Sequence, residues 1–419
     1  DDKIIAEKTV EMPQPQSAMI IIDFHNGEVK AIMGGRGEKS LNLSLNRAVD
    51  SMRQPGSVFK ILASYAPAID LKKATAATII VDAPYTAPGG YKPKNYYSGY
   101  RGPSTIRDGI RDSMNILAVK NMINTGVANC FDYLLKFGLT TLVDGEEING
   151  KIYSDKVAST ALGGITKGVT QLEVTAAYAT IANLGEYNRP IFYTKVLDHN
   201  NNILLDNQPE PKKVLSPQTA YILTDMMKDV VKKGTGTKAR FKKSKMPISG
   251  KTGTTNDTKD LTFVGYTPYY AAGIWLGYDK PKTMREDHGY HLKLWSSIME
   301  EIHSSLEYKD FIKPSGLTSV SICKKTGLLA SSMCKSSGTA VTENFIANTQ
   351  PKKYCSSHAQ KNIENIDDKN KNKTDNGQEI QTESKEPNTE KTADKSKSEP
   401  AATIDNSNSN IPAEPVMPD

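Results

Sequence analysis

Three short groups of polar residues in this chain have the types and the order that a serine acylation site requires. They are Ser57-Val58-Phe59-Lys60, Ser113-Met114-Asn115 and Lys251-Thr252-Gly253-Thr254. A serine and a lysine one helical turn apart lie on the same face of a helix, so the amine can take the proton of the hydroxyl. The first group therefore predicts a nucleophilic serine, Ser57, with Lys60 as its general base.

The residues around these groups indicate how they would be positioned. Pro55-Gly56 breaks the preceding segment, and the apolar residues that follow predict a helix that begins at Ser57. The free N–H groups and the positive dipole at the start of a helix favour a developing oxyanion. Residues 246–255 predict a strand opposite this helix, with Gly253 allowing a peptide to approach the strand edge closely.

A second set of similar groups is not interpreted as a site. Ser321-Ile322-Cys323-Lys324 is followed directly by Lys325-Thr326-Gly327, so these groups cannot form opposing walls of a cleft. We expect Lys325-Thr326-Gly327 to be a turn, with the glycine at the position where φ is positive.

The residues that flank the first set resemble class A penicillin-binding proteins, which combine a glycosyltransferase and a transpeptidase in bacterial wall synthesis. Residues 53–60, Arg-Gln-Pro-Gly-Ser-Val-Phe-Lys, are similar to the R-Q-P-G-S-x-F-K stretch of that family. Further similar stretches are Asn46-Arg47-Ala48, Ala161-Leu162-Gly163-Gly164, Gly168-Val169-Thr170, Phe263-Val264-Gly265-Tyr266-Thr267-Pro268 and Trp275-Leu276-Gly277-Tyr278-Asp279. The resemblance covers residues 16–305 and extends more weakly beyond them.

The resemblance implies a role for each catalytic residue. Ser57 would attack the carbonyl between two D-alanines at the end of a peptidoglycan stem peptide, and Lys60 would accept its proton. Ser113, linked to Lys60 and Lys251, would relay the proton to the departing D-alanine. An amine from a second stem peptide would then resolve the acyl-enzyme and form the cross-link.

The resemblance also implies the substrate contacts, which involve Asn115, Thr252, Gly253 and Thr254. Asn115 would hold a substrate amide, and the hydroxyls of Thr252 and Thr254 would bind the terminal carboxylate of the peptide or of a β-lactam antibiotic. The backbone N–H groups of Ser57 and Thr254 would form the oxyanion hole. The implied reaction uses no cofactor and no metal.

Three other functions use the same polar residues. A class A β-lactamase needs a glutamate between the second and third groups, and the acidic run at residues 144–149 is interpreted as a polar turn instead. A D,D-carboxypeptidase would use water as its acceptor. A non-catalytic β-lactam sensor would retain the site without turnover. Every expected polar residue is present, which argues against a site that has lost its activity.

Composition divides the 419 residues unevenly. Residues after 356 contain no Phe, Tyr or Trp, so that segment cannot bury enough apolar surface to fold. We expect a connector at 1–15, a penicillin-binding transpeptidase domain at 16–307, a small Cys-containing segment at 308–356 and a disordered low-complexity tail at 357–419. The net charge of +6 comes without an aromatic and basic pattern, so no nucleic acid partner is expected.

Targeting signals are not found in the sequence itself. No run of eighteen apolar residues exists that could span a bilayer, and the chain begins with Asp1. We expect a fragment of a longer protein whose upstream part contains a membrane anchor and the glycosyltransferase. The resemblance places such a protein at the outer face of the bacterial cell membrane, and its divisome or elongation partners are not identified by the sequence.

The pattern of apolar residues predicts an α+β fold. A hairpin is expected at residues 17–35 around Asn26-Gly27, a second at 190–205, helices at 170–184, 217–233 and 290–303, and strands at 248–255, 261–266 and 270–277. Strands at both ends predict an antiparallel sheet in which the first hairpin pairs with the late strands. The resemblance implies the penicillin-recognising serine transpeptidase fold, with helices flanking the sheet and a mainly helical subdomain. Residues 85–102 are rich in Tyr, Gly and Pro and precede the second group, so we expect them to form a long loop at the cleft rim.

The four cysteines are distributed unevenly. Cys130 lies among apolar residues and is expected to be a buried thiol. Any two of Cys323, Cys334 and Cys355 could be oxidised outside the cell, and we favour Cys334 with Cys355 because Cys323 lies on a predicted strand. With His358 they would make a zinc ligand set, but their long and irregular spacings argue against it.

Overall fold

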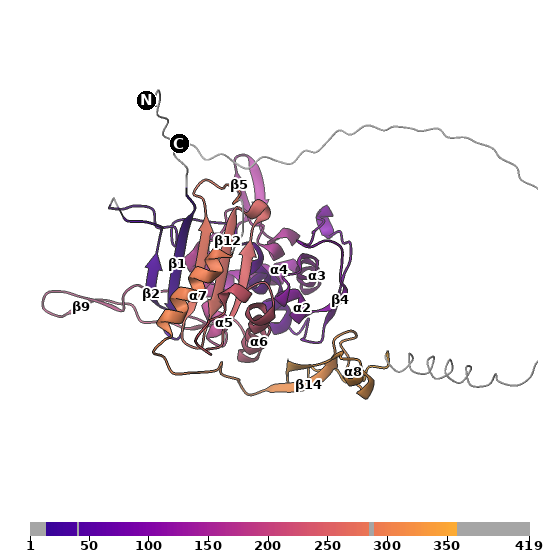
Figure 1. Ribbon diagram of the computed structural model, residues 1–419. Helices are drawn as coiled ribbons and strands as arrows, with labels where there is room; N and C mark the ends of the chain where they lie inside the picture. The colour runs from indigo at the N-terminus through magenta and orange to yellow at the C-terminus, as the bar shows by residue number, and fades with distance from the viewer. Residues whose placement is uncertain (1–13, 40–41, 285–288, 358–419) are drawn as a thin grey trace, which may run out of the picture. The chain divides into compact units, whose positions relative to one another are not determined.

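The computed structural model describes residues 14–39, 42–284 and 289–357 and contains a five-stranded antiparallel sheet. The strand order is β11-β12-β13-β1-β2, as Figure 1 shows. These strands are β1 (Gln16–Asp23), β2 (Glu28–Met33), β11 (Ser249–Thr254), β12 (Asp260–Tyr266) and β13 (Ala271–Gly277). Because β1 pairs with β13, with Met19 opposite Ile274, the predicted pairing of the N-terminal hairpin with the late strands is confirmed.

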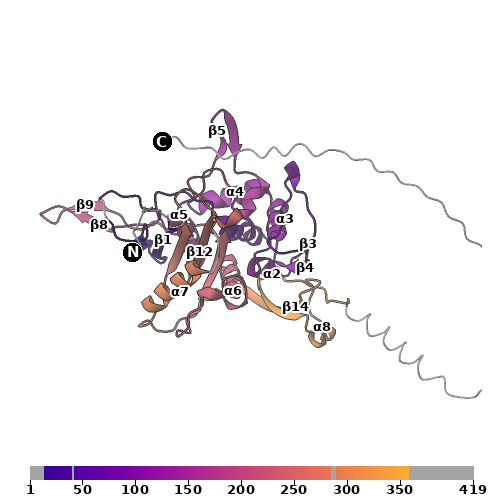
Figure 2. The same cartoon turned by 45° about the horizontal axis from the view of Figure 1, so that its top comes forward.

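Alternate residues of β1 enter two separate cores. Met19 and Ile21 pack with Trp295 of α7 (Tyr290–Ile302), whereas Ile20 and Ile22 belong to the larger core on the other face. That larger core includes residues of α5 (Gln171–Ala182) and α6 (Pro217–Lys233). Both sheet faces are therefore covered by helices, with α7 on one side and α5 and α6 on the other (Figures 1 and 2). All three helices were predicted from sequence, and α6 has the predicted bounds.

Most of the remaining helical elements come between the first hairpin and α6 in the sequence. The helix predicted to begin at Ser57 forms, but it starts as the short 3₁₀ turn η1 (Gly56–Val58) and continues through the π-helical turn η2 (Ile61–Tyr65) into α1 (Ala66–Asp70). The other helical elements are α2 (Ile106–Arg111), α3 (Asn115–Thr125), α4 (Val127–Lys136), η3 (Pro88–Gly90), η4 (Ala158–Leu162), η5 (Thr237–Ala239) and η6 (Asn256–Thr258). Cys130 is fully buried here, as predicted.

Several short strand pairs lie outside the main sheet. The prediction of a polar turn at residues 144–149 is wrong, because these residues form most of a hairpin between β5 (Asp144–Ile148) and β6 (Lys151–Ser154). Asn149 and Gly150 have φ values of 53° and 75° and make the tight turn that such a hairpin needs. The remaining pairs are β3 (Ile79–Asp82) with β4 (Gly102–Thr105), β7 (Glu186–Tyr187) with β10 (Lys212–Lys213), and β8 (Lys195–Leu197) with β9 (Ile203–Asp206).

The last described residues form a small hairpin of their own. It consists of β14 (Leu317–Cys323) and β15 (Ala340–Ile346), with the one-turn helix α8 (Ser332–Ser336) between them. Gly327 has a φ of 72°, so the predicted turn at Lys325-Thr326-Gly327 is confirmed. The second set of similar groups, at residues 321–327, is thus part of this hairpin.

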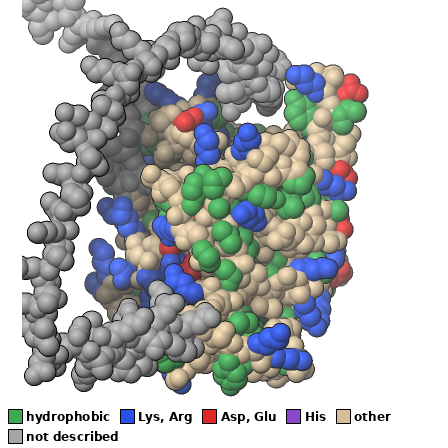
Figure 3. Space-filling view, turned by 90° about the vertical axis from the view of Figure 1, so that its right-hand side faces the viewer, with side chains coloured by type: hydrophobic (Ala, Val, Ile, Leu, Met, Phe, Trp, Pro, Cys, Tyr) green, Lys and Arg blue, Asp and Glu red, His purple; other side chains and the backbone are tan. Residues whose placement is uncertain are grey.

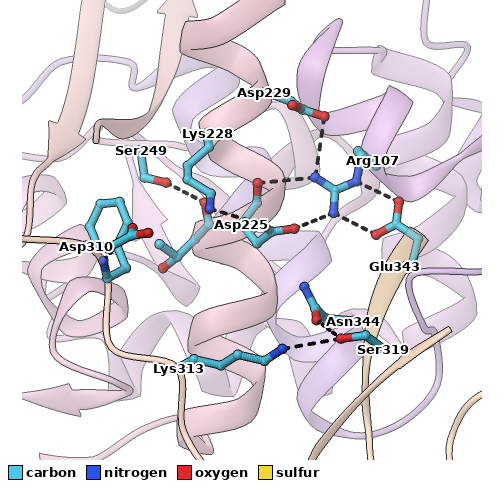
Figure 4. Close-up of polar contacts among 12 residues, drawn as sticks. Arg107, Asp225, Lys228, Asp229, Ser249, Asp310, Lys313, Ser319, Glu343 and Asn344 are labelled. Atoms are coloured by element: carbon cyan, nitrogen blue, oxygen red, sulfur yellow. Dashed lines mark hydrogen bonds and ion pairs between the residues drawn. The ribbon is translucent and has the colours of Figure 1, made fainter. Parts of the chain in front are cut away.

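One arginine joins this hairpin to the helical region. Arg107 of α2 makes two hydrogen bonds of 2.6 Å to the carboxylate of Glu343 on β15, and a third of 2.6 Å to Asp225 on α6 (Figure 4). Glu343 is only 2% exposed, so its charge is balanced mainly by Arg107. The pKa of Glu343 is still raised, because burial outweighs the contacts with Arg107.

The surface carries apolar side chains in small groups among polar ones. On the face in Figure 3, green hydrophobic side chains lie between blue lysines and arginines. Within the described ranges, none of the helices combines the length and the hydropathy that a bilayer crossing requires. The predicted connector at 1–15 and tail at 357–419 fall almost entirely outside the described residues.

Candidate active site

Ser57 lies at the start of a helical segment that abuts the third polar group. A methyl group added at Gly56 would stand 2.9 Å from the carbonyl oxygen of Thr254, and Gly56 itself has a φ of 55°. The hydroxyl of Tyr178 on α5 donates a 2.7 Å hydrogen bond to the carbonyl of Val58 and fixes this turn from behind. The first residue after Pro55 must therefore be glycine, because a side chain there would push β11 away from Ser57.

Ser113 occupies a turn between α2 and α3, and its backbone is in the left-handed region with a φ of 53°. A serine rarely adopts this conformation, and such positions concentrate at functional sites. The turn is held by the Met114 N–H, which donates to the carbonyl of Gly109 at 2.9 Å. Ser113 is 4% exposed, so its hydroxyl lies in the protein interior.

The Ser113 hydroxyl lies between two lysine amines. Lys60 Nζ is 3.0 Å and Lys251 Nζ is 2.8 Å from Ser113 Oγ. A hydroxyl has two acceptor positions and one proton, so when both amines donate, the proton remains available for a third group. The arrangement suits a proton relay that connects two different amines to one oxygen.

The remaining hydrogen bonds of Lys60 define what it must do to act as a base. Its Nζ also donates to the carbonyl of Ser113 at 2.6 Å and to Asn115 Oδ1 at 2.5 Å. Three donors are the full complement of an ammonium group, whereas a neutral amine has two N–H bonds and one lone pair. One of these hydrogen bonds must therefore reverse or break before Lys60 can accept a proton.

Burial makes the neutral form of both amines accessible. Lys60 and Lys251 are each 0% exposed, and no carboxylate among the described residues makes a hydrogen bond or ion pair with either Nζ. Burial, followed by the charge of Lys251, holds the pKa of Lys60 well below its usual range. Burial lowers the pKa of Lys251 from 10.5 to about 7.

The eight predicted site residues come together in two ways. Lys60, Ser113, Asn115, Lys251 and Thr252 are joined by hydrogen bonds, the last through its carbonyl, which accepts from Lys251 Nζ at 3.1 Å. Ser57, Gly253 and Thr254 are brought close by backbone packing, since a methyl group at Gly253 would lie 2.6 Å from the Pro55 carbonyl.

The structure has no hydrogen bond between Ser57 Oγ and Lys60 Nζ. The two residues keep the one-turn spacing on the segment that begins with η1, and catalytic hydrogen bonds often tighten only when a substrate is bound. The contact expected from sequence between the nucleophile and its base therefore stays a prediction.

Two residues near the site were missed from sequence. Asn95, in the predicted rim loop, accepts a 2.9 Å hydrogen bond from the Asn115 N–H and donates one of 2.8 Å to buried Asp82. Thr235, just after α6, has its hydroxyl 2.7 Å from that of Thr252. Neither residue belongs to a motif, and only the folding of distant segments brings them to the site.

Residues that carry the family resemblance hold the nucleophile in place. Gln54 exchanges two side-chain hydrogen bonds with the backbone of Ile165, of 2.6 and 3.1 Å. Arg53 and Val169 exchange two backbone hydrogen bonds of 2.9 Å. The segment before Ser57 is thus paired with residues 165–169. This pairing gives a structural reason why the residues around both segments resemble the family.

Comparison with known proteins agrees with this geometry. The family described as "Penicillin binding protein transpeptidase domain" matches residues 17–298, and the family described as "Penicillin-binding protein 1A, C-terminal domain" matches residues 313–360. Penicillin-binding protein 1A of Clostridium perfringens is 37% identical over 374 residues, covering 85% of this chain and 44% of the relative. Penicillin-binding protein 1F of Bacillus subtilis is 35% identical over 309 residues, covering 72% of this chain and 39% of the relative.

The chain spans less than half the length of these two curated relatives. Among solved structures, penicillin-binding protein 1A from Haemophilus influenzae has a TM-score of 0.70 at 23% identity, covering 82% of this chain and 55% of that one. PonA1 from Mycobacterium tuberculosis has a TM-score of 0.62 at 25% identity, covering 72% of this chain and 81% of that one. The predicted fold and the resemblance to class A enzymes are confirmed, and the chain belongs to the penicillin-binding proteins through a transpeptidase domain of that family.

Proposed function

We propose that this chain is a D,D-transpeptidase that cross-links peptidoglycan stem peptides through an acyl-enzyme on Ser57. The single observation that carries the proposal is the Ser113 hydroxyl placed between two buried amines, at 3.0 Å from Lys60 and 2.8 Å from Lys251. Acyl transfer from an amide requires a proton to leave the nucleophile and to reach the departing nitrogen, and the hydrogen bonds among Lys60, Ser113 and Lys251 can carry a proton between those two steps.

In the first half-reaction, Ser57 Oγ forms a bond to the carbonyl carbon of the penultimate D-alanine. Lys60 takes the hydroxyl proton, and the C–N bond to the last D-alanine breaks. The departing nitrogen receives a proton through Ser113, with Lys251 stabilising the oxygen of the relay. The N–H groups of Ser57 and Thr254 face the developing oxyanion, an interaction class worth about 3–4 kcal/mol.

In the second half-reaction, an amine of another stem peptide attacks the ester carbonyl. The new C–N bond forms, the C–Oγ bond breaks, and the proton of the amine returns to Ser57. Asn115 holds a substrate amide, and the hydroxyls of Thr252 and Thr254 bind the terminal carboxylate of the donor. β-Lactams would acylate Ser57 in the same position, outside the cytoplasm, where peptidoglycan is assembled.

The surroundings of the site support an amine rather than water as the acceptor. Two carboxylates from the segment between the second and third motifs are engaged in structural hydrogen bonds. Asp155 accepts from the backbone of Val143 and from Thr166, and Glu173 caps α5 at Thr170. Among the described residues, Lys60, Ser113 and Lys251 make no hydrogen bond to a carboxylate that could activate water for deacylation.

The test compares transfer with hydrolysis in one reaction. The protein is incubated with a stem-peptide thioester and a D-amino acid, and both products are quantified by mass spectrometry. We expect the transfer product to dominate and to disappear in Ser57→Ala. Hydrolysis that dominates at every acceptor concentration would replace the proposal with a carboxypeptidase, and rapid catalytic hydrolysis of penicillin would replace it with a β-lactamase.

A further inference from the structure

Three cysteines converge in the C-terminal hairpin, far from the candidate active site in sequence. Cys323 ends β14, Cys334 lies in α8 and Cys355 follows β15, and their sulfur atoms all lie within 4.8 Å of one another. The first two side chains are 0% exposed and the third is 4% exposed. The irregular spacings in the sequence argued against a shared site, but the fold brings the three sulfur atoms together.

A short extended segment at Leu329 holds two of these cysteines in place. Leu329 pairs with Ile322 on one side and with Tyr354 on the other. The Cys323 N–H donates to the Leu328 carbonyl, and the Cys355 N–H donates to the Leu329 carbonyl, both at 2.8 Å. Cys323 and Cys355 are therefore fixed by backbone pairing on the two sides of one segment.

The third cysteine is positioned by the turn that follows α8. The Thr339 N–H donates to the Cys334 carbonyl at 2.9 Å, and the Lys324 N–H donates to the Thr339 carbonyl at 2.9 Å. These bonds tie α8 to the residue next to Cys323. The three sulfur atoms are thus held together by backbone hydrogen bonds, without a covalent link between them.

Two hydroxyl groups lie beside the sulfur atoms. Thr339 Oγ1 is 3.8 Å from Cys323 Sγ, and Ser331 Oγ is 3.4 Å from Cys334 Sγ. In the structure the Cys323 thiol donates to Thr339 Oγ1, and either atom can be the donor between Ser331 and Cys334. Once a thiol has lost its proton, the neighbouring hydroxyl can instead donate to the thiolate. Donors of this kind around a metal site orient the ligands and stabilise their negative charge.

A disulfide does not account for this arrangement. Cys334 and Cys355 are not joined by a disulfide in the structure, so the pairing that we favoured from sequence is not present. A disulfide would use two of the three converging sulfur atoms and leave the third as a buried thiol beside it. A single tetrahedral ion uses all three.

We propose that Cys323, Cys334 and Cys355 bind one structural zinc ion through three thiolates. Zn²⁺ favours thiolate ligands and tetrahedral geometry, and each thiol releases its proton to solvent as the ion binds. His358, considered above as a ligand, lies outside the described residues, and the proposal rests on the three sulfur atoms. The fourth ligand of the zinc ion would be a water molecule or a further side chain.

The ion would stabilise a segment that is too small to form a large core. The hairpin contributes few large side chains to the interior, with Ile322 and Phe345 among those that join the main core. A metal that links β14, α8 and the segment at Cys355 would make this part of the chain a rigid platform for Glu343, which contacts Arg107. The proposal is independent of the reaction at Ser57.

The test measures bound metal rather than activity. The full chain is purified with zinc present, dialysed to remove loosely bound ions, and examined by elemental analysis and by native mass spectrometry. We expect one zinc ion per chain, retained in Cys130→Ser, whose thiol is buried elsewhere, and lost in Cys355→Ser. Replacement by Co²⁺ should give a thiolate-to-cobalt charge-transfer band that Cys130→Ser retains.

A second variant covers the case in which loss of a cysteine prevents folding. Thr339→Val keeps all three sulfur atoms and removes one hydroxyl, and we expect it to bind zinc about tenfold more weakly, as measured by competition with a chromophoric chelator. Wild-type protein without bound zinc, zinc retained in Cys355→Ser, or a disulfide among the three cysteines in zinc-treated protein would each overturn the proposal.

Discussion

Lys251→Met should make the stability of this protein depend less on pH. The pKa of Lys251 falls from 10.5 in an exposed lysine to about 7 in the folded protein. Between these pH values the unfolded chain binds more protons than the folded one, so stability rises with pH. The slope from this amine is about 1.4 kcal/mol per pH unit, and the total across the window is about 5 kcal/mol.

The variant removes this dependence together with two hydrogen bonds. The lost bonds join Lys251 Nζ to Ser113 Oγ and to the Thr252 carbonyl, and each is worth about 1 kcal/mol. Below the folded pKa, where the wild-type must bury a charged amine, we therefore expect Lys251→Met to be more stable by about 3 kcal/mol. At alkaline pH the order should reverse, because the wild-type then buries a neutral amine and retains both hydrogen bonds.

Urea unfolding followed by the fluorescence of Trp275 and Trp295, both buried, gives the free energy of unfolding at each pH. Lys60 titrates in both proteins, and removing the Lys251 charge also raises the pKa of Lys60, so the difference between wild-type and Lys251→Met reports Lys251 together with its effect on Lys60. Lys232→Met, at an exposed position, serves as the control and should show no pH-dependent difference. If the difference in unfolding free energy between the two proteins stays constant across this pH range, the reasoning is refuted. Such a result would mean that burial does not shift the pKa of the Lys251 amine.

Other substitutions test the remaining parts of the site. Ser57→Ala should abolish labelling by fluorescent penicillin, measured on a denaturing gel, whereas Ser321→Ala should label like the wild-type; label retained without the Ser57 hydroxyl would remove it as the nucleophile. Lys60→Arg should acylate at least about a hundredfold more slowly in stopped-flow assays, because guanidinium stays protonated; an unchanged rate would exclude Lys60 as the base. In the wild-type, acylation should rise with pH, because the lowered pKa of Lys60 places its neutral form closer to neutrality. Glu343→Gln should destabilise the attachment of the C-terminal hairpin by about 2 kcal/mol, seen as faster hydrogen exchange in β15, because the hairpin loses the charged partner of Arg107 while Arg107 keeps Asp225; unchanged exchange would contradict that role.

Much of the main sheet and of the candidate site could be predicted from the sequence. Strands with clear alternation and helices with strong end signals, such as Ser216-Pro217 before α6, have local causes. The three polar groups were identified because their order and spacing are specific. Lys60 and Lys251 lie on predicted elements, whereas the turn between α2 and α3 that places Ser113 beside both amines is seen only in the structure.

The parts that could not be predicted depend on contacts between distant residues. Asn95 reaches Asn115 only because Asp82 holds its loop, and no periodic pattern marks such a loop residue. The hairpin at residues 144–154 was missed because its strands are mostly exposed, so no buried face marks them in the sequence. The convergence of the three cysteines was missed because their separation in sequence says nothing about the pairing at Leu329.

The strand order of the sheet has a consequence for how this protein folds. Strand β1, which comes before the other four strands of the sheet in this sequence, lies between β2 and β13, and Ser17 on β1 donates a hydrogen bond to the Trp275 carbonyl on β13 across 258 positions. Lys251 lies on β11, which is joined to β1 only through β12 and β13. Such long-range pairing forms late and slowly. Ser57 has Lys60 three positions away on the same segment, but it gains Lys251 only when the sheet from β1 to β11 has formed, so its acylation reports a completely folded domain and not a partly folded chain.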